Sequence, residues 1–344
     1  MSTTVSTMKA IVCQSPDHFE LVDKERPVAK AGEALLQVKK IGICGTDLHA
    51  YRGRQPYFVY PRILGHELSA EIVAIGDTVA PFQIGDKVTV VPYMNCGTCH
   101  ACEQGKTNCC ERLEVLGVHR DGGMQQYITV PYAHLVNTND ISLDAAATIE
   151  CLAIGAHAVR RAEVKKGQYA LVAGAGPIGL GVMKFLKLQG VHVIALDMNE
   201  ERLAFCKQWG AADDTLHVAD QPLEKLQEIT NGALAQVVFD ATGNTAAMEA
   251  AFHYASFGGK VVYVSLVKGN ISFSDPDFHK KEMTLMGSRN ATMQDFEHVL
   301  AAIREGHVDT DAFITHGSTF ETMIEHFEDW LKPETGVIKA MVTV

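Results

Sequence analysis

One stretch near the middle of the chain constrains the fold more than any other. Residues 169–173 form a short apolar run that predicts a buried strand, and Gly174-Ala-Gly-Pro-Ile-Gly179 follows at once. Residues 180–189 have the composition of a helix, and Gly190 ends it. A strand, a glycine-rich turn and a helix in this order predict a βαβ unit whose helix N-terminus binds a pyrophosphate.

The next strand supplies the second part of this signature. Residues 191–196 are apolar and end at Asp197. A carboxylate in this place would bind ribose hydroxyls and repel a 2′-phosphate, which predicts NAD in preference to NADP. The alternative is that Asp197 is only a carboxylate at a helix N-terminus. The residues predicted to contact the cofactor are Gly174, Gly176, Pro177, Ile178, Gly179, Asp197, Arg202, Thr242 and Ser265.

Strand and turn patterns divide the chain of 344 residues into two domains. After residue 153, strands alternate with helices, which predicts an α/β domain with a doubly wound parallel sheet. Residues 8–150 instead contain many short strands punctuated by glycine and proline, which predicts a barrel-like β module. We expect residues 1–152 to form the first domain and 153–289 the second. Residues 290–344 are expected to pack back on the first domain through helices and an edge strand at 337–344.

Four cysteines within the β module have metal-ligand spacing. Cys96, Cys99 and Cys102 recur at steps of three, and Cys110 follows. Four thiolates predict a tetrahedral structural zinc site with no open position. Disulfides or a redox pair are the alternative, which an odd total of nine cysteines and the absence of a secretion signal disfavour. Cys109 could replace Cys110, and spacing does not decide between them; we choose Cys110.

A second set of metal-ligand residue types lies upstream of this cluster. Cys44 is in a turn of small residues, and Gly65-His66-Glu67 follows about twenty residues later. A thiolate, an imidazole and a carboxylate would hold a catalytic zinc and leave its fourth position open. Taken alone, the same residues fit a buried thiol beside two solvated polar groups. Asp47 either orients His66 or is an exposed turn carboxylate.

Charge and hydropathy exclude several other classes of protein. The net charge is −11 and no basic stripe is present, which argues against partners such as nucleic acid or anionic membranes. No apolar run approaches ~20 residues, and the N-terminus lacks the apolar segment of a signal peptide. We therefore expect a cytoplasmic protein with a small-molecule substrate.

Together these motifs resemble the zinc-dependent medium-chain dehydrogenases over essentially the whole chain. The resemblance implies a GroES-like catalytic domain joined to a Rossmann domain, with two zinc ions per chain and NAD as hydride acceptor. It also implies a homodimer or homotetramer. Within the family the chain is similar to the branch that contains sorbitol, threonine and sugar-acid dehydrogenases. That branch has a second glutamate near the metal, and Glu150 matches it; Cys151, one residue away, is interpreted as a core thiol.

The resemblance also assigns roles to single residues. Glu150 would bind the zinc or its water, and Thr46 would begin a proton relay towards His49. Without the resemblance, Thr46 would be interpreted as a turn hydroxyl and His49 as a surface histidine. Residues 273–292 resemble galactonate-oxidising members of the branch, and Arg289 would bind a substrate carboxylate. The predicted substrate is a sugar acid or polyol, with L-galactonate preferred. The alternatives are a threonine-type dehydrogenase and a non-catalytic, zinc-stabilised dinucleotide-binding protein.

Overall fold

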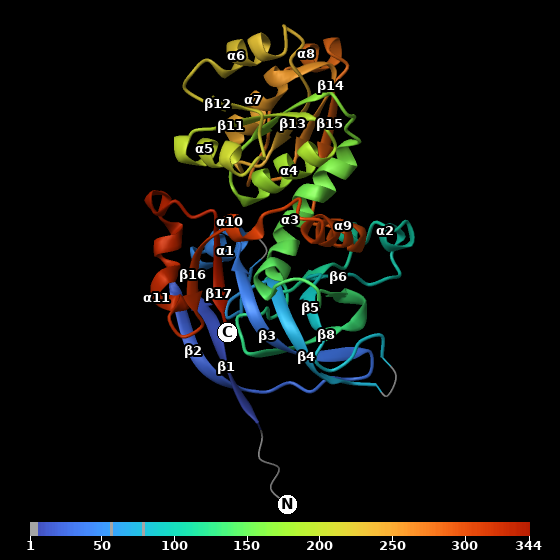
Figure 1. Ribbon diagram of the computed structural model, residues 1–344, viewed down its shortest axis with the longest axis vertical. Coiled ribbons are helices and arrows are strands. Elements are labelled where there is room, and N and C mark those ends of the chain that lie inside the picture. Colours follow the sequence, from blue (N-terminus) through green and yellow to red (C-terminus); the bar gives the residue numbers. More distant parts are fainter. Residues whose placement is uncertain (1–5, 56–57, 78–79) are drawn as a thin grey trace, which may run out of the picture. The chain divides into compact units, whose positions relative to one another are not determined.

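The computed structural model describes residues 6–55, 58–77 and 80–344 (Figure 1). The chain divides into two compact units. Unit 1 comprises Met1–Glu150 together with Thr292–Val344, and unit 2 comprises Cys151–Ala291. The C-terminal segment therefore belongs to the same unit as the N-terminal half, although unit 2 separates them in the sequence.

A seven-stranded sheet forms the framework of unit 1. Every described pair in this sheet is antiparallel except β16 with β17. Large apolar side chains such as Leu36, Ile41 and Leu68 are fully buried in its core. The strand order is β16 (Ile314–Thr319), β17 (Lys339–Thr343), β3 (Glu33–Ile43), β4 (Glu67–Ile75), β5 (Lys87–Val90) and β9 (Leu135–Asn137), and β8 (Tyr127–Pro131) pairs with β3.

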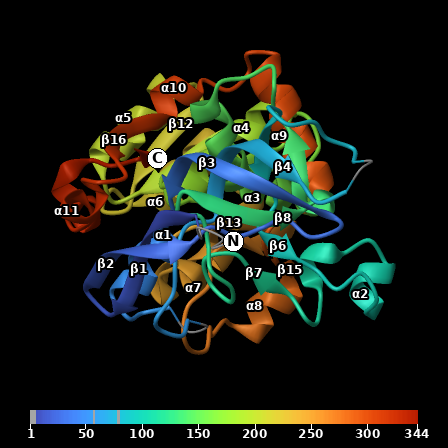
Figure 2. The ribbon, with the colours of Figure 1, turned by 90° about the horizontal axis from the view of Figure 1, so that it is seen from below.

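Shorter elements complete unit 1, as the view from below shows (Figure 2). Two strand pairs lie outside the main sheet: β1 (Thr7–Ser15) with β2 (His18–Glu25), and β6 (Tyr93–Met94) with β7 (Glu114–Val115). The helices are α1 (Gly45–Tyr51), α2 (His100–Glu103), α9 (Met293–Arg304), α10 (Thr310–Phe313) and α11 (Met323–Phe327), and α3 (Leu143–Ala162) begins here and continues into unit 2.

The C-terminal strand corrects one sequence-based expectation. It was expected at an edge, but β17 lies between β16 and β3, and β16 is the edge strand. The first four residues of β17 are buried. β16 alternates between half-buried and exposed residues, as a strand with one open side does. The β16 segment is polar and lacks a strand pattern in the sequence, so only the apolar strand that follows it is predicted, and it is predicted at the edge.

Unit 2 is a six-stranded parallel sheet, which confirms the predicted doubly wound architecture. The order is β12 (Asp214–His217), β11 (His192–Asp197), β10 (Tyr169–Ala173), β13 (Ala235–Asp240), β14 (Ala255–Tyr263) and β15 (Thr284–Gly287). The chain winds outward from β10 to one edge and then from β13 to the other, so the strand order reverses between these two strands. The helices are α4 (Pro177–Leu188), α5 (Glu200–Gln208), α6 (Pro222–Ile229), α7 (Thr245–Tyr254) and α8 (Asp275–Lys280).

The glycine-rich turn between β10 and α4 is packed too tightly for side chains. A Cβ atom on Gly179 would lie 1.8 Å from the carbonyl oxygen of Gly174, and Gly174 itself has φ +95°. Only glycine fits at position 179 without a backbone shift. At position 174, glycine adopts the positive φ without strain. The turn can therefore bring the N-terminus of α4 close to the end of β10.

Candidate metal centres and cofactor site

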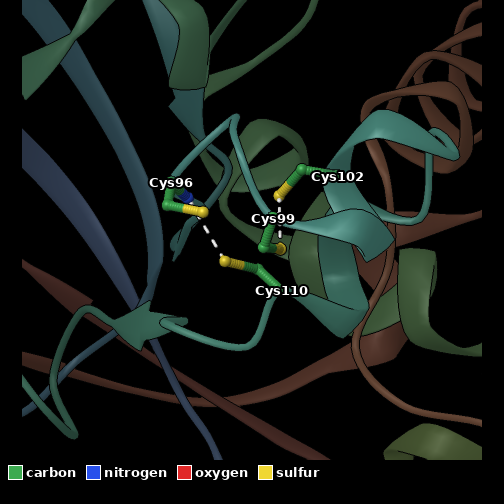
Figure 3. Close-up of side chains that lie close together, drawn as sticks. All are labelled: Cys96, Cys99, Cys102 and Cys110. Atoms are coloured by element: carbon green, nitrogen blue, oxygen red, sulfur yellow. Dashed lines mark hydrogen bonds between the residues drawn. The ribbon is translucent and has the colours of Figure 1, made fainter.

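The four sulfur atoms predicted to form a structural zinc site lie together (Figure 3). The Sγ atoms of Cys96, Cys99, Cys102 and Cys110 are all within 4.8 Å of one another. In the part of the chain that the structure describes, every cysteine is free of disulfides. Cys109, which spacing left as an alternative, is exposed and outside the cluster. A set of four thiols at this separation fits one tetrahedral zinc ion.

Hydrogen bonds prepare part of this cluster to be ionised. The pKa of the Cys96 thiol is lowered to about 5, mainly by a hydrogen bond from the Thr98 backbone and then by Arg112. Burial has the opposite effect on Cys110 and raises its pKa to about 11. Because thiolates are the zinc ligands, metal binding at Cys110 would release a proton from a thiol that burial otherwise keeps neutral.

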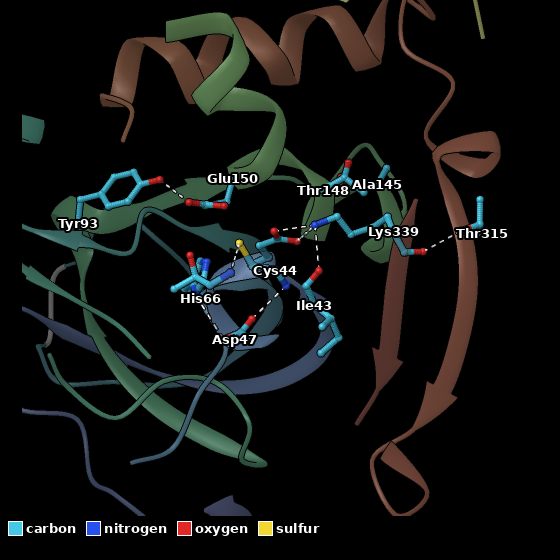
Figure 4. A network of polar contacts seen from close by, with 12 residues as sticks. Ile43, Cys44, Asp47, His66, Tyr93, Ala145, Thr148, Glu150, Thr315 and Lys339 are labelled. Atoms are coloured by element: carbon cyan, nitrogen blue, oxygen red, sulfur yellow. Dashed lines mark hydrogen bonds and ion pairs between the residues drawn. The ribbon is translucent and has the colours of Figure 1, made fainter. Parts of the chain in front are cut away.

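The second cluster forms at the start of two elements of unit 1 (Figure 4). Ligand atoms of Cys44, His66 and Glu67 lie within 4.8 Å of one another. Cys44 is the N-cap of α1, and Glu67 begins β4 directly after His66. Both His66 and Glu67 are buried. One sulfur, one nitrogen and one oxygen donor are the ligand types expected of a catalytic zinc site.

Asp47 joins the two segments that carry these three residues. Its Oδ2 accepts a hydrogen bond from the Cys44 backbone N–H at 3.0 Å, and its Oδ1 accepts one from the Gly65 N–H at 3.0 Å. The same Oδ1 lies 3.7 Å from His66 Nδ1. The side chain is buried, which raises the pKa of its carboxyl group. Asp47 is therefore not an exposed turn carboxylate, and it fixes the backbone on both sides of the cluster.

A lysine that the sequence analysis missed completes the surroundings of Glu67. The Lys339 ammonium donates to both carboxylate oxygens of Glu67, at 2.7 and 2.6 Å, and to the Ile43 carbonyl at 3.2 Å. Lys339 is 1% exposed and Glu67 is 0% exposed. Its only signal in the sequence is a single charge in an otherwise apolar strand. The Lys339 ammonium thus holds both the Glu67 carboxylate and the backbone carbonyl of Ile43, the residue that precedes Cys44.

Glu150, on α3, is buried beside the same cluster, and its charge interacts with those of His66 and Glu67. Burial raises the pKa of its carboxyl group to about 7. Its Oε1 accepts a hydrogen bond from the Tyr93 hydroxyl, whereas Oε2 is buried with no hydrogen-bond partner among the described residues. His66 Nδ1 is likewise buried without a hydrogen-bond partner within the described chain. Buried polar atoms without partners cost free energy, so these side chains fit a bound cation.

The two residues of the predicted proton relay both lie on α1. Thr46 and His49 are three positions apart, so they share one face of the helix. The Thr46 N–H also donates to the Cys44 sulfur at 3.4 Å. The pKa of His49 is lowered, first by partial burial and then by Arg54. The predicted relay would therefore begin beside a predicted metal ligand and end at an exposed residue.

In unit 2, the end of β11 is bonded to the glycine-rich turn. Asp197 Oδ2 accepts a hydrogen bond from the Ala175 N–H at 2.6 Å, and Oδ1 accepts one from the Asn199 N–H at 2.9 Å. Asn199, and not Asp197, is the N-cap of α5. The N-cap of α4 is Gly176, which has no capping side chain. The first N–H groups of α4 can therefore bind a pyrophosphate.

The other predicted cofactor residues lie around the same edge of this sheet. A Cβ on Gly176 would be 4.0 Å from the Arg202 guanidinium. Thr242 and Ser265, beyond the ends of β13 and β14, both donate hydroxyl hydrogen bonds to Asp240, a buried carboxylate not assigned from the sequence. Arg289, the predicted substrate contact, follows β15 and is exposed. Lys281, which follows α8, donates a hydrogen bond to the Ala255 carbonyl at 2.9 Å.

Comparisons with known proteins show the family to which the chain is related. Residues 30–140 match the family model of the alcohol dehydrogenase GroES-like domain, and residues 177–305 match that of the zinc-binding dehydrogenases. L-galactonate-5-dehydrogenase of Escherichia coli K12 is 44% identical over 98% of this chain and 100% of its own. Sorbitol dehydrogenase of Bacillus subtilis is 32% identical over 99% of this chain and 98% of its own.

A solved structure supports the same relationship. An alcohol dehydrogenase from E. coli CFT073, solved in complex with NADH, is 30% identical, with a TM-score of 0.92 over 98% of this chain and 100% of its own. Among the described residues, no helix has both the length and the apolar composition needed to cross a membrane.

The buried ion pair at Lys339 leads to a stability prediction. In Lys339→Met, Glu67 keeps its buried charge without a partner, which should lower the free energy of unfolding of zinc-free protein by about 3–5 kcal/mol. Zinc bound at the cluster would replace the missing positive charge, so the loss should be smaller in zinc-loaded protein. Urea denaturation with and without chelator measures both differences.

Two variants serve as controls for this prediction. Lys339→Met combined with Glu67→Gln should recover part of the lost stability, because the uncompensated charge is gone. Lys332→Met removes the exposed ion pair with Asp329 and should leave the urea midpoint unchanged. An equal loss in Lys339→Met with and without zinc would contradict a shared role of lysine and metal in balancing Glu67.

Proposed function

Because the chain belongs to the zinc-type medium-chain alcohol dehydrogenases, we propose that it oxidises a secondary hydroxyl of a sugar acid, L-galactonate, with NAD as hydride acceptor. The observation that carries this proposal is the cluster of Cys44, His66 and Glu67 with the buried carboxylate of Glu150 beside it. Polyol and sugar-acid dehydrogenases are the relatives that support the substrate class. The family assignment also argues against the alternative of a non-catalytic, zinc-stabilised dinucleotide-binding protein.

The residues of unit 1 would divide the work at the reacting hydroxyl. A zinc ion held by Cys44, His66 and Glu67 supplies Lewis acidity, which lowers the pKa of an alcohol. Glu150 is not part of this three-residue cluster, but its buried Oε2, which has no hydrogen-bond partner in the described chain, would be available to the zinc ion or to its water. Thr46 would accept the hydroxyl proton and pass it towards His49, which lies one turn further along α1 and nearer to solvent.

The four-cysteine cluster would hold a second zinc ion, which has no open position for a substrate. Cys44→Ser should give a folded protein that has lost activity and contains about one zinc per chain in place of two. Cys99→Ser should instead lower the urea midpoint, because the closed site stabilises the fold. Metal analysis and denaturation of both variants test this division. A Cys44→Ser enzyme that retains both zinc ions would contradict it.

Unit 2 would bind the cofactor, whose nicotinamide accepts the hydride. The glycine-rich turn and the uncapped N-terminus of α4 would hold the pyrophosphate, and Asp197 would bind the ribose hydroxyls. Each Asp197 oxygen already accepts one backbone N–H and has further lone-pair capacity for a hydroxyl donor. The negative charge would repel the 2′-phosphate of NADP.

The cofactor preference can be tested at this single carboxylate. The wild type should have a higher kcat/KM with NAD than with NADP, and Asp197→Ser should narrow the difference because the repulsion is removed. Asp220→Ser, which removes an exposed carboxylate elsewhere in unit 2, is the control and should leave the ratio unchanged. A wild type that uses NADP equally well would show that Asp197 does not select the cofactor.

The substrate assignment depends on recognition of a carboxylate. Arg289 presents a planar guanidinium, which can bind two carboxylate oxygens at once. Arg289→Ala should reduce kcat/KM for L-galactonate by about 30- to 150-fold. The effect on the matching neutral polyol should be far smaller, because that substrate has no carboxylate to lose. Lys280→Ala, which removes an exposed positive charge from the same unit, is the control.

A panel of substrates decides between the remaining alternatives. Initial rates of NAD reduction should be highest with L-galactonate among hexonates, hexitols, threonine and simple alcohols. A preference for threonine would support the amino-alcohol alternative, and a preference for a hexitol would overturn the sugar-acid assignment. Equal losses for acid and polyol in Arg289→Ala would show that Arg289 does not bind the carboxylate.

A further inference from the structure

We propose that Tyr93 is a positioning residue that holds Glu150 in the orientation needed at the open metal site, and that the four-cysteine segment anchors it there. The proposal rests on the proposed function, because it gives Glu150 a place beside a metal. Tyr93 belongs to no sequence motif. Its anchoring would give the four-cysteine zinc site a role in the geometry of the reaction site.

The ring of Tyr93 is fixed in three ways. Tyr93 lies on β6 and pairs with Val115 of β7 in antiparallel register. Its ring meets Phe296 of α9 edge to face, with centroids 6.3 Å apart and planes at 79°. Tyr93 is only 4% exposed. A side chain held by strand pairing, an aromatic neighbour and burial has little freedom to move its hydroxyl group.

The four-cysteine segment is the connection between these same two strands. β6 ends at Met94, β7 begins at Glu114, and all four clustered cysteines lie between them. The segment is also held at its base, where the Cys96 N–H donates to the Cys110 sulfur at 3.3 Å. Nearby, Asn95 donates to the Cys102 sulfur at 3.6 Å. A metal ion that fixes the four sulfurs would therefore also fix the position of β6.

At the other end, the Tyr93 hydroxyl determines how the Glu150 carboxylate is turned. The hydroxyl donates to Oε1, and Oε2 is buried without a hydrogen-bond partner in the described part of the chain (Figure 4). When Glu150 is ionised, this hydrogen bond is charge-assisted and among the stronger ones in proteins. With Oε1 occupied, the remaining oxygen is the one available to the metal or to a water on it. Without the hydroxyl, the carboxylate could rotate about its side-chain bonds.

Tyr93→Phe tests the proposal, because it keeps the ring and its contact with Phe296 but removes the hydroxyl. Zinc-loaded enzyme is mixed with the chromophoric chelator 4-(2-pyridylazo)resorcinol, and the release of the two zinc ions is followed over time. We expect the faster phase, from the open site, to accelerate about tenfold, and the slower phase to be unchanged. The kcat/KM for L-galactonate should fall about tenfold or more.

A double-variant comparison separates positioning from a general structural effect. If Tyr93 acts through Glu150, then Tyr93→Phe should add nothing to the loss caused by Glu150→Gln alone. Tyr51→Phe is the matched control, because it removes a tyrosine–glutamate hydrogen bond of 3.2 Å, to Glu328, in the same unit. That variant should release zinc at the wild-type rate and keep wild-type kcat/KM.

Two results would overturn the proposal. One is an unchanged rate of zinc release from the open site in Tyr93→Phe. The other is a Tyr93→Phe effect of the same size in the wild type and in Glu150→Gln. If the wild type does not oxidise L-galactonate, the proposed substrate is wrong, and the zinc-release comparison still decides the role of Tyr93.

Discussion

The ion pair between Lys339 and Glu67 is the interaction on which the rest of the reaction site depends. Burying a carboxylate is costly unless a positive charge and hydrogen bonds compensate it, and here one ammonium bonds to both oxygens. The surrounding groups are mostly acidic: Asp47, Glu150 and the Cys44 thiol lie in the same region. A single lysine does not balance three carboxyl groups and a thiol. A divalent cation bound at the cluster would add two positive charges and offset most of the remaining negative charge.

This interaction also explains why the last part of the chain belongs to unit 1. Lys339 and Glu67 are 272 residues apart in the sequence, and all of unit 2 lies between them. β17 brings the lysine in by pairing with β3, whose last residue, Ile43, directly precedes Cys44 and accepts a hydrogen bond from the same ammonium. The predicted metal cluster therefore gains its counter-charge only after the chain has passed through unit 2. The first half of the sequence supplies the ligands, and the C-terminus supplies their counter-charge.

The sequence could predict what depends on local spacing and could not predict what depends on distant contacts. The turn from Gly174 to Gly179 was recognisable because its function needs glycines at fixed intervals after a strand. The cysteine cluster was recognisable for the same reason, but the choice between Cys109 and Cys110 depends on which side chain turns inward. Lys339 and Tyr93 belong to no motif, because each meets its partner only through the tertiary fold. The position of β17 inside the sheet was missed because its neighbour β16 is polar and lacks the apolar pattern of a buried strand.

The fold holds Glu67 and Glu150 in different ways, and this difference suits them to different roles at the site. Both oxygens of Glu67 are bonded to Lys339, so any movement of that carboxylate would leave a buried ammonium without its partner. Glu150 is bonded through one oxygen to a hydroxyl group, which carries no charge. Its second oxygen has no hydrogen-bond partner in the described chain, so it can gain or lose a contact without breaking an ion pair. Glu67 is suited to a fixed part of the site, whereas Glu150 is suited to contacts that change as substrate enters and product leaves.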